Sequence, residues 1–487
     1  MKFFIALILL SLNLQFAKAQ KQGNIWMGGG NGGINFNSDT TVSFFRPDNS
    51  IFGRTSASIC DTNGNLLFYT NGFRIFNSSY SVIQNGDSLN IGDYISFNYG
   101  YMVTPDGAVI IPVPGETTKY YLFYMDLNFI NTEMGLAFFP THLFYSLIDN
   151  SLDGGSGGIV AGMKDISIIN DTLAQFGMQA MKHGNGRDWW LICHEYGTNA
   201  YYTFLIDVFG IHGPMVQKIG IRYQLFNAGI ASIMKFSQDG SRFLHVTLDS
   251  NMVELFDFNR CTGLLSNYSM FKIDSNFVYA DGASFSPNKK YIYVSTGFDM
   301  IRQYDIEAND ITGSQIIIGT DDGIPDPFYA KYYLHQLGPD EKIYVTSYDQ
   351  SYSLHVINSP NTAGLGCDFV QRGFHLLDGT SWFSGAPNIP NYSLGSSSGS
   401  DCDTLTSVLF MQPTVFSYSI YPNPCYYSSQ LSISGATEKA EIFLYNTLGQ
   451  LLYKTIAFPS NNFIHTQLPV RDLVAGIYLV KVSMGKK

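Results

Sequence analysis

The chain has 487 residues, too many for one ordinary hydrophobic core and enough for two or three domains, or for one large repeat domain with an appendage. Aromatic residues make up 15% of it and charged residues only 14%, a balance that excludes a coiled coil and a mostly disordered chain. The net charge is -11 and no cluster of Lys and Arg occurs, which argues against binding to nucleic acid or to an anionic membrane surface. Abundant Gly, Tyr and Phe favour short strands joined by tight turns, so we expect an all-β fold.

Residues 1–19 have the pattern of a secretory signal peptide. Lys2 supplies the positive charge, an apolar run follows, and Ala17 and Ala19 give the small-residue cleavage pattern. We therefore expect the mature chain to begin at Gln20 after cleavage behind Ala19. The apolar run is too short to span a bilayer stably, and we expect no transmembrane segment elsewhere.

A repeated segment occupies the middle of the chain: an aromatic strand that ends in Asp or Asn. The copies end at Asn77, Asp126, Asp207, Asp257, Asp305 and Asn358. The interval is close to fifty residues except before Asp207, where a Gly-rich insertion around residues 153–158 lengthens the unit. A second strand and a turn precede each copy. Four short strands repeated at this interval predict a β-propeller over residues 20–393.

We expect seven blades, with six and eight as the alternatives. Six units are visible as repeats, and a seventh would form if residues 25–28 paired with residues 381–384 and joined the two ends of the ring. Each blade can bury its faces only against its neighbours, so the ring has to close.

The turns of these units resemble those of exported WD40/YVTN-like propeller proteins. The resembling segments are residues 26–36, 61–72 and 356–361, followed by Cys367. The resemblance implies a propeller fold and brings no catalytic residues with it.

The cysteines do not have the spacing of a zinc hairpin. They stand at positions 60, 193, 261, 367, 402 and 425. In an oxidising compartment they could form up to three disulfides, whose connectivity the sequence does not fix. Alternatively, Cys60 and Cys193 lie in strand-like runs as small buried residues.

Three candidate sites in the middle region are better explained as ordinary β-structure. His194 and Glu195 are adjacent, so on a strand they face opposite ways and do not share a site. Asp61, Asn63 and Asn65 alternate like calcium ligands, but the acid that completes such a loop is replaced by Gly72, which favours a hairpin turn. We interpret the acidic loop 321–326 as a solvated connection. We expect no cofactor, no metal and no contiguous catalytic motif.

The C-terminal region is predicted to be a separate unit. Residues 394–415 include a Ser/Gly run and read as a linker. Residues 416–487 then contain alternating apolar strands, which predict a small Ig-like β-sandwich.

Specific motifs in this unit resemble the type A C-terminal sorting domain of the type IX secretion system. They comprise Tyr421, Pro422, Asn423 and Pro424, then Gly449, then Gly476, Tyr478 and Lys481. The resemblance implies passage through the outer membrane of a Gram-negative bacterium with the type IX translocon as partner. It also implies later removal of the domain and release or surface attachment of the remainder.

Two functions remain open from the sequence. The first is an exported binding protein whose loops hold a surface glycan or a protein, and the second is a secreted hydrolase or lyase acting on polysaccharide or peptide in the propeller channel. We favour binding, because the sequence shows export signals without a catalytic constellation.

Overall fold

The computed structural model describes residues 20–48, 50–90, 92–97, 100–132, 135–222, 232–247, 251–274, 279–403, 417–421, 428–434, 438–446, 450–460, 463–471, 473–474 and 476–484. The chain divides into two compact units, Met1–Thr404 and Leu405–Lys487. Both units are built from antiparallel strands, which confirms the all-β class.

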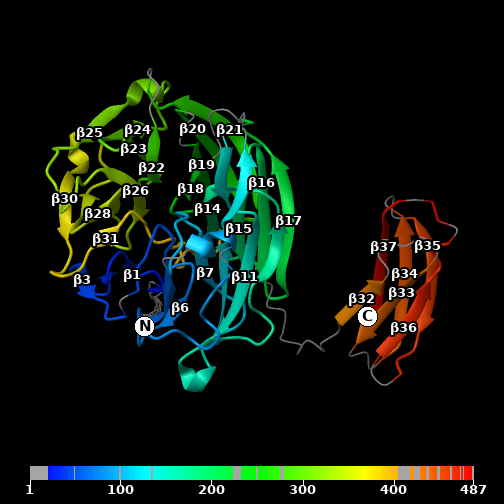
Figure 1. Cartoon of the computed structure of the whole chain (residues 1–487). Helices are drawn as coiled ribbons and strands as arrows, with labels where there is room; N and C mark the ends of the chain where they lie inside the picture. The colour runs from blue at the N-terminus through cyan, green and yellow to red at the C-terminus, as the bar shows by residue number, and fades with distance from the viewer. Residues whose placement is uncertain are drawn as a thin grey trace, which may run out of the picture. The chain divides into compact units, whose positions relative to one another are not determined.

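Unit 1 consists of successive small sheets arranged around a centre (Figure 1). The first two sheets have three strands each. They are β1 (Ile25–Gly28), β2 (Gly32–Asn35) and β3 (Val42–Phe45), then β4 (Ala57–Cys60), β5 (Leu66–Thr70) and β6 (Ile75–Asn77). The third sheet has five strands, β7 (Ala108–Pro112), β8 (Lys119–Met125), β11 (His142–Asp149), β12 (Gly158–Ile159) and β13 (Ile166–Asn170), and the hairpin of β9 (Asn128–Thr132) and β10 (Gly135–Phe139) extends from it.

The next four sheets have four strands each, running from the centre outward. They are β14 (Leu173–Lys182), β15 (Trp189–Glu195), β16 (Ala200–Asp207) and β17 (Gly210–Lys218); β18 (Ser232–Phe236), β19 (Arg242–Thr247), β20 (Met252–Asn259) and β21 (Leu264–Lys272); β22 (Ala280–Phe285), β23 (Tyr291–Thr296), β24 (Met300–Asp305) and β25 (Ile316–Thr320); and β26 (Tyr332–Leu337), β27 (Ile343–Ser347), β29 (Ser353–Ile357) and β30 (Phe369–His375). The first strand of each of these sheets lies toward the centre, and the last strand lies at the outer edge (Figure 1). Short 3₁₀ turns occur at Gly92–Phe97, Asp153–Gly155, Thr312–Ser314 and Gly364–Cys367.

The core of unit 1 lies between sheets. Inner strands β22 and β23 are buried along their whole length, because neighbouring sheets cover both of their faces. The first and last sheets also touch: the Trp26 and Phe36 rings lie 5.5 and 5.6 Å from the Tyr344 ring, centroid to centroid. These edge-on contacts pack the first sheet against the last one.

The two chain ends of unit 1 meet differently from the expected pairing. Strand β1 pairs with β2, and β31 (Trp382–Phe383) pairs with β28 (Gln350–Ser351), so residues 25–28 and 381–384 do not form one ladder. They approach through an isolated bridge between Gly30 and Ser381. A Cβ on Gly29, whose φ is +57°, would lie 2.1 Å from the Ser381 carbonyl oxygen, so only glycine permits this approach.

The Asp or Asn at the end of several repeated strands holds a neighbouring turn. The Asn77 side-chain oxygen accepts the N–H groups of Ser79 and Ser81, and the Asp207 carboxylate accepts that of Phe209. Asp126 accepts the N–H groups of Thr141 and His142 at the base of the β9–β10 hairpin. The repeat in the sequence therefore reflects turn chemistry as well as strand burial.

The chain that follows β31, residues 384–403, runs back along the inner strands, and we call it the strap. Asn388 donates to the Met178 carbonyl and Tyr392 to the Ile110 carbonyl, at 3.0 and 2.6 Å. Asn391 donates to the Gln238 carbonyl at 2.8 Å. Each donor side chain thus ties the strap to a different sheet.

The end of the strap is fixed to the fifth sheet by a disulfide. Cys261, in the turn between β20 and β21, bonds to Cys402, while Cys60, Cys193 and Cys367 are buried free thiols. Ser397 also donates its backbone N–H to the Gly184 carbonyl. The Ser/Gly run at the start of the predicted linker therefore lies against unit 1. Cys425 is outside the described residues.

Unit 2 is a small two-layered β-structure. One sheet contains β32 (Ser417–Tyr421), β33 (Ser429–Ser434) and β36 (Phe463–Leu468), and the other β35 (Leu451–Ala457), β34 (Ala440–Asn446) and β37 (Tyr478–Met484). Leu431, Ile433, Ile442, Leu444 and Ile464 form its buried core.

Breaking the Cys261–Cys402 bridge should destabilise unit 1. The bridge joins positions 141 residues apart, and loss of such a long-range cross-link typically lowers the free energy of unfolding by about 2–5 kcal/mol. Chemical denaturation of the Cys261→Ala/Cys402→Ala variant measures the change. Reducing agent should lower the native protein to the stability of the variant and leave the variant itself unchanged; a native protein that is insensitive to reduction would contradict this role.

Candidate functional site

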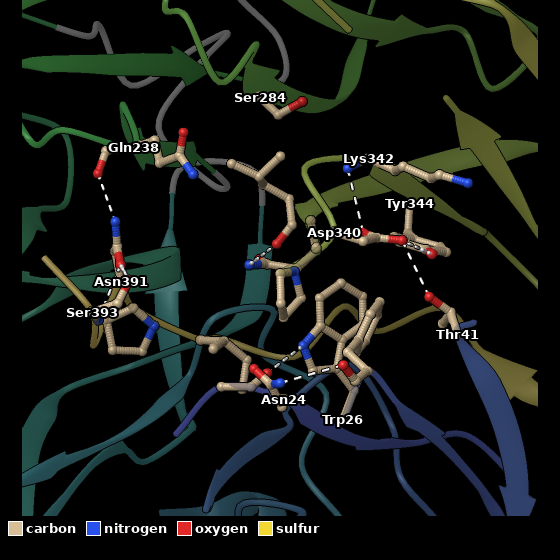
Figure 2. Close-up of a pocket in the computed structure, with 18 of the residues that line it drawn as sticks. Asn24, Trp26, Thr41, Gln238, Ser284, Asp340, Lys342, Tyr344, Asn391 and Ser393 are labelled. Atoms are coloured by element: carbon tan, nitrogen blue, oxygen red, sulfur yellow. Dashed lines mark hydrogen bonds between the residues drawn. The ribbon is translucent and has the colours of Figure 1, made fainter. Parts of the chain in front are cut away.

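A cavity of about 740 Å³ opens where the inner strands of unit 1 end (Figure 2). Strands β14, β18, β22 and β26 and the turns after them form one part of its wall. The N-terminal segment 20–24, the loop 36–41 and strap residues 389–393 form the rest. Segments from both ends of unit 1 therefore build one site.

The turn after β26 supplies one charged edge of the cavity. Gly338 donates its N–H to the Lys342 carbonyl at 2.8 Å, which closes a tight turn around Asp340. The Asp340 carboxylate accepts the Tyr344 hydroxyl at 2.8 Å and the Thr41 hydroxyl at 3.2 Å (Figure 2). Asp340 is thereby fixed as an acceptor between the last sheet and the loop after β2.

The opposite edge is built by amide and hydroxyl groups. The Asn391 side chain from the strap donates to the Gln238 carbonyl, and the Ser393 hydroxyl donates to the Asn391 side-chain oxygen at 2.8 Å (Figure 2). On the cavity floor, the Asn24 side chain donates to the Phe36 carbonyl at 3.3 Å. These bonds hold neutral hydrogen-bonding groups around the opening.

A largely buried ion pair forms part of the wall, because Lys235 itself lines the cavity. The Lys235 ammonium lies 2.9 Å from the Asp106 carboxylate, and the Gln179 amide donates to the same carboxylate at 3.0 Å. Burial raises the pKa of Asp106, and the nearby Lys235 opposes that shift. Asp106 precedes β7 while Gln179 and Lys235 come from β14 and β18, so the cluster joins three sheets at the centre.

His335 lines the cavity as a neutral side chain. Its two ring nitrogens lie 3.2 Å from the Ser284 hydroxyl and 2.6 Å from the Ser295 hydroxyl. Burial lowers the pKa of His335 to about 3, so the imidazole is uncharged at neutral pH. With both nitrogens engaged, His335 serves as a hydrogen-bonding partner of the Ser284 and Ser295 hydroxyl groups.

The sequence candidates of the middle region have structural roles. His194 is buried on β15, whereas the neighbouring Glu195 is half-buried and accepts hydroxyl hydrogen bonds from Thr198 and Tyr202. They do not share a site, as predicted. The Asp61 carboxylate accepts the N–H groups of Asn63 and Asn65 in the turn between β4 and β5, so the hairpin interpretation is also confirmed.

The acidic loop 321–326 is tied to the last sheet. Both guanidinium NH2 groups of Arg372 donate to the two oxygens of Asp322. Within the described part of the chain, no three His, Cys, Asp or Glu side chains are grouped so that they could hold a metal ion.

The predicted export residues lie only partly within the described structure. Ala19, Pro422, Asn423, Pro424 and Gly449 fall outside it. Gln20 lines the cavity. Tyr421 ends β32, Gly476 precedes β37 and Tyr478 begins β37, where its hydroxyl donates to the Val474 carbonyl at 2.6 Å. Lys481 on β37 lies opposite Phe443, with its ammonium 6.0 Å from the ring centroid.

The C-terminal unit is similar to a known family. Residues 419–487 match the family described as Secretion system C-terminal sorting domain. This sorting domain implies that the chain is secreted. Among the described residues, no helix has the length and apolar character needed to cross a membrane. A search of curated proteins found no match.

Several solved structures resemble the chain weakly. The β-propeller domain of Cps50 (Swd1) from Myceliophteria thermophila is 9% identical, with 67% of this chain and 91% of that chain covered and a TM-score of 0.37. The periplasmic gluconolactonase PpgL from Pseudomonas aeruginosa is 12% identical, with 75% and 97% covered and a TM-score of 0.34. A functionally unknown protein from Desulfotomaculum acetoxidans DSM 771 is also 12% identical, with 76% and 96% covered and a TM-score of 0.39.

The cavity itself was not predicted from the sequence. Its walls come from segments as distant as Asn24 and Asn391, whose proximity depends on how the strap runs. One feature of the sequence could have indicated the strap: residues 387–393 are polar, contain two prolines and belong to no repeat unit.

Buried histidines should make unit 1 sensitive to acid. The pKa of His335 falls from an ordinary value of 6.5 to about 3 on folding, so the stability it contributes is present above pH 6.5 and is lost as the pH falls toward 3. Replacing it by a non-titrating residue, His335→Gln, should flatten the dependence of the unfolding free energy on pH by up to about 1.4 kcal/mol per pH unit. Denaturant titrations between pH 4 and 7 test this, with the exposed His375→Gln as control. Equal slopes in native protein and His335→Gln would refute it.

Proposed function

We propose that the protein is an exported binding protein, in which a seven-bladed propeller presents the cavity and an Ig-like sorting domain directs export by the type IX secretion system. In this proposal residues 1–19 are the signal peptide, residues 20–393 the propeller, residues 394–415 the connection and residues 416–487 the sorting domain. The resemblance to WD40/YVTN-like proteins, the signal cleavage at Ala19 and the surface location belong to the same proposal.

The observation that supports binding is the chemistry of the cavity wall. Amide and hydroxyl side chains dominate its polar groups, including Asn24, Gln238, Asn391 and Ser393. Such neutral donors and acceptors suit a ligand with many hydroxyl groups, and we propose an oligosaccharide segment. A few fixed polar groups in a preformed cavity are what specific recognition requires.

The alternative, a hydrolase or lyase with its active site in the channel, has less support than a binding function. Among the described residues that line the cavity, only Asp39 and Asp340 have carboxylates. Asp340 already accepts two hydroxyl hydrogen bonds, and His335 is held neutral. A glycosidase needs two carboxylates free to act on opposite sides of the scissile bond.

Export should depend on unit 2. A chain ending at Asp403 keeps the Cys261–Cys402 bridge but lacks the sorting domain. In a host with a type IX system we expect it to accumulate in the periplasm, whereas the full chain reaches the surface or the medium. Immunoblots of the cell fractions measure the distribution, and unchanged thermal unfolding of the propeller unit controls for misfolding. Truncated protein outside the cell would disprove the sorting role.

Ligand binding should depend on the cavity edges. Screening the full mature chain against a glycan array identifies a ligand, and calorimetry measures its affinity. We expect Lys342→Ala and Gln238→Ala each to weaken binding about tenfold, the effect of losing about one good hydrogen bond. Lys272→Ala, on the outer strand β21, is the matched control and should have no effect.

Two results would contradict the proposal. One is cleavage of the bound glycan, which would establish the hydrolase or lyase instead. The other is binding that is insensitive to both cavity variants.

A further inference from the structure

A second surface lies at the opposite ends of the inner strands, away from the cavity. Four neighbouring segments there carry aromatic side chains, and we call this surface the aromatic rim. Its exposed members are Tyr279, Phe328, Tyr329, Tyr348 and Tyr352, and the half-buried Phe298 packs against Tyr348. Tyr333, near the start of β26, lies beside this rim. His335 and the turn after β26 lie at the other end of the strand and line the cavity.

Backbone hydrogen bonds hold the four segments side by side. Gly297 donates to the Tyr279 carbonyl and Tyr332 to the Phe298 carbonyl, at 3.0 and 2.9 Å. Tyr348 donates to the Lys331 carbonyl at 2.9 Å, and Tyr352 to the Asp326 carbonyl at 3.1 Å. The rim is therefore a built surface and not a set of unrelated exposed residues.

Some rings of this surface are in contact with one another, and others stand open to solvent. The Phe298 and Tyr348 ring centroids are 4.6 Å apart, and those of Tyr333 and Tyr348 are 5.3 Å apart. Phe328 and Tyr329 nevertheless expose 55% and 57% of their surface. Gathered aromatic exposure on this scale marks interaction surfaces in soluble proteins.

The rim already accepts a guanidinium group. The Arg54 guanidinium carbon lies 5.3 Å from the Tyr333 ring centroid and 5.0 Å from the Tyr348 ring centroid, which is the geometry of a cation–π contact. The rings of this surface are thus arranged so that a planar cation can stack on them.

The charge of the loops is negative. Residues 279–281, 297–299, 321–331 and 348–352 contain six aspartates and one lysine. Asp281 is buried, whereas Asp299, Asp321, Asp322, Asp326 and Asp349 reach the surface, and only Asp322 among them forms an ion pair within the described residues, with Arg372. This excess of carboxylates favours a cationic partner over a neutral or an anionic one.

We propose that the aromatic rim is a docking surface for an arginine-containing peptide segment of a partner protein, with guanidinium groups stacked on the exposed rings and paired with the surrounding carboxylates. Arginine is preferred to lysine because its planar group stacks on aromatic faces and is more weakly hydrated. The docking is independent of the cavity, so one chain can hold a ligand and a partner together.

Fluorescence anisotropy of labelled hexa-arginine with the full mature chain tests the proposal. We expect saturable binding that weakens with salt, weaker binding of hexa-lysine, and at least a tenfold loss in the Phe328→Ala/Tyr329→Ala variant. Asp349→Asn should reduce affinity by a few-fold. The matched control is Phe209→Ala, which removes an exposed ring (84% exposed) from the turn between β16 and β17, and it should bind like the native protein.

Three outcomes would overturn the proposal. They are no saturable binding of hexa-arginine, equal binding by Phe328→Ala/Tyr329→Ala and native protein, and competition by the neutral hexasaccharide chitohexaose, which would indicate a glycan surface. Because both rings are exposed, unchanged thermal unfolding of the double variant is expected, and it separates loss of binding from loss of fold.

Discussion

The sheets of unit 1 are too small to bury their own faces, and this constraint governs the rest of the molecule. Strands β22 and β23 are covered only because a sheet lies on each side of them. A linear row of such sheets would leave apolar faces open at its two ends. Trp26 and Phe36 contact Tyr344, so residues of the first and last sheets that are more than three hundred positions apart pack against each other.

The cavity follows from the same arrangement. When sheets stand around a centre, their inner strands approach one another and polar groups from different sheets face each other there. The Lys235–Asp106 pair shows what this requires: a charge from β18 is neutralised by one that precedes β7, and Gln179 of β14 completes the cluster. The strap then fills part of the centre, where its Asn388 and Asn391 side chains donate to the Met178 carbonyl of β14 and to the Gln238 carbonyl in the turn after β18.

The repeat was visible in the sequence because its cause is local. The aromatic residues of each repeated strand are there because the strand is buried. The Asn77 or Asp207 that ends such a strand is there because its side chain accepts hydrogen bonds from the next turn. The hairpin at Asp61 and the opposed orientation of His194 and Glu195 were predictable for the same reason. The pairing of β1 with β2, and not with residues 381–384, was not predictable, because both segments have strand-like composition and composition does not decide which strand edges meet. The route of the strap depends on single side-chain hydrogen bonds to distant carbonyls, for which a sequence offers no periodic signal.

Cys402 is bonded to Cys261 close to the end of unit 1. It stands upstream of Leu405, where unit 2 begins, and downstream of every strap residue that contacts the cavity. Proteolysis anywhere between Asp403 and β32 would therefore release the tail without freeing the strap, because the new chain end would still be anchored to the β20–β21 turn. A protein trimmed in this way keeps every segment of the cavity wall, because loss of the tail leaves the strap covalently attached to unit 1.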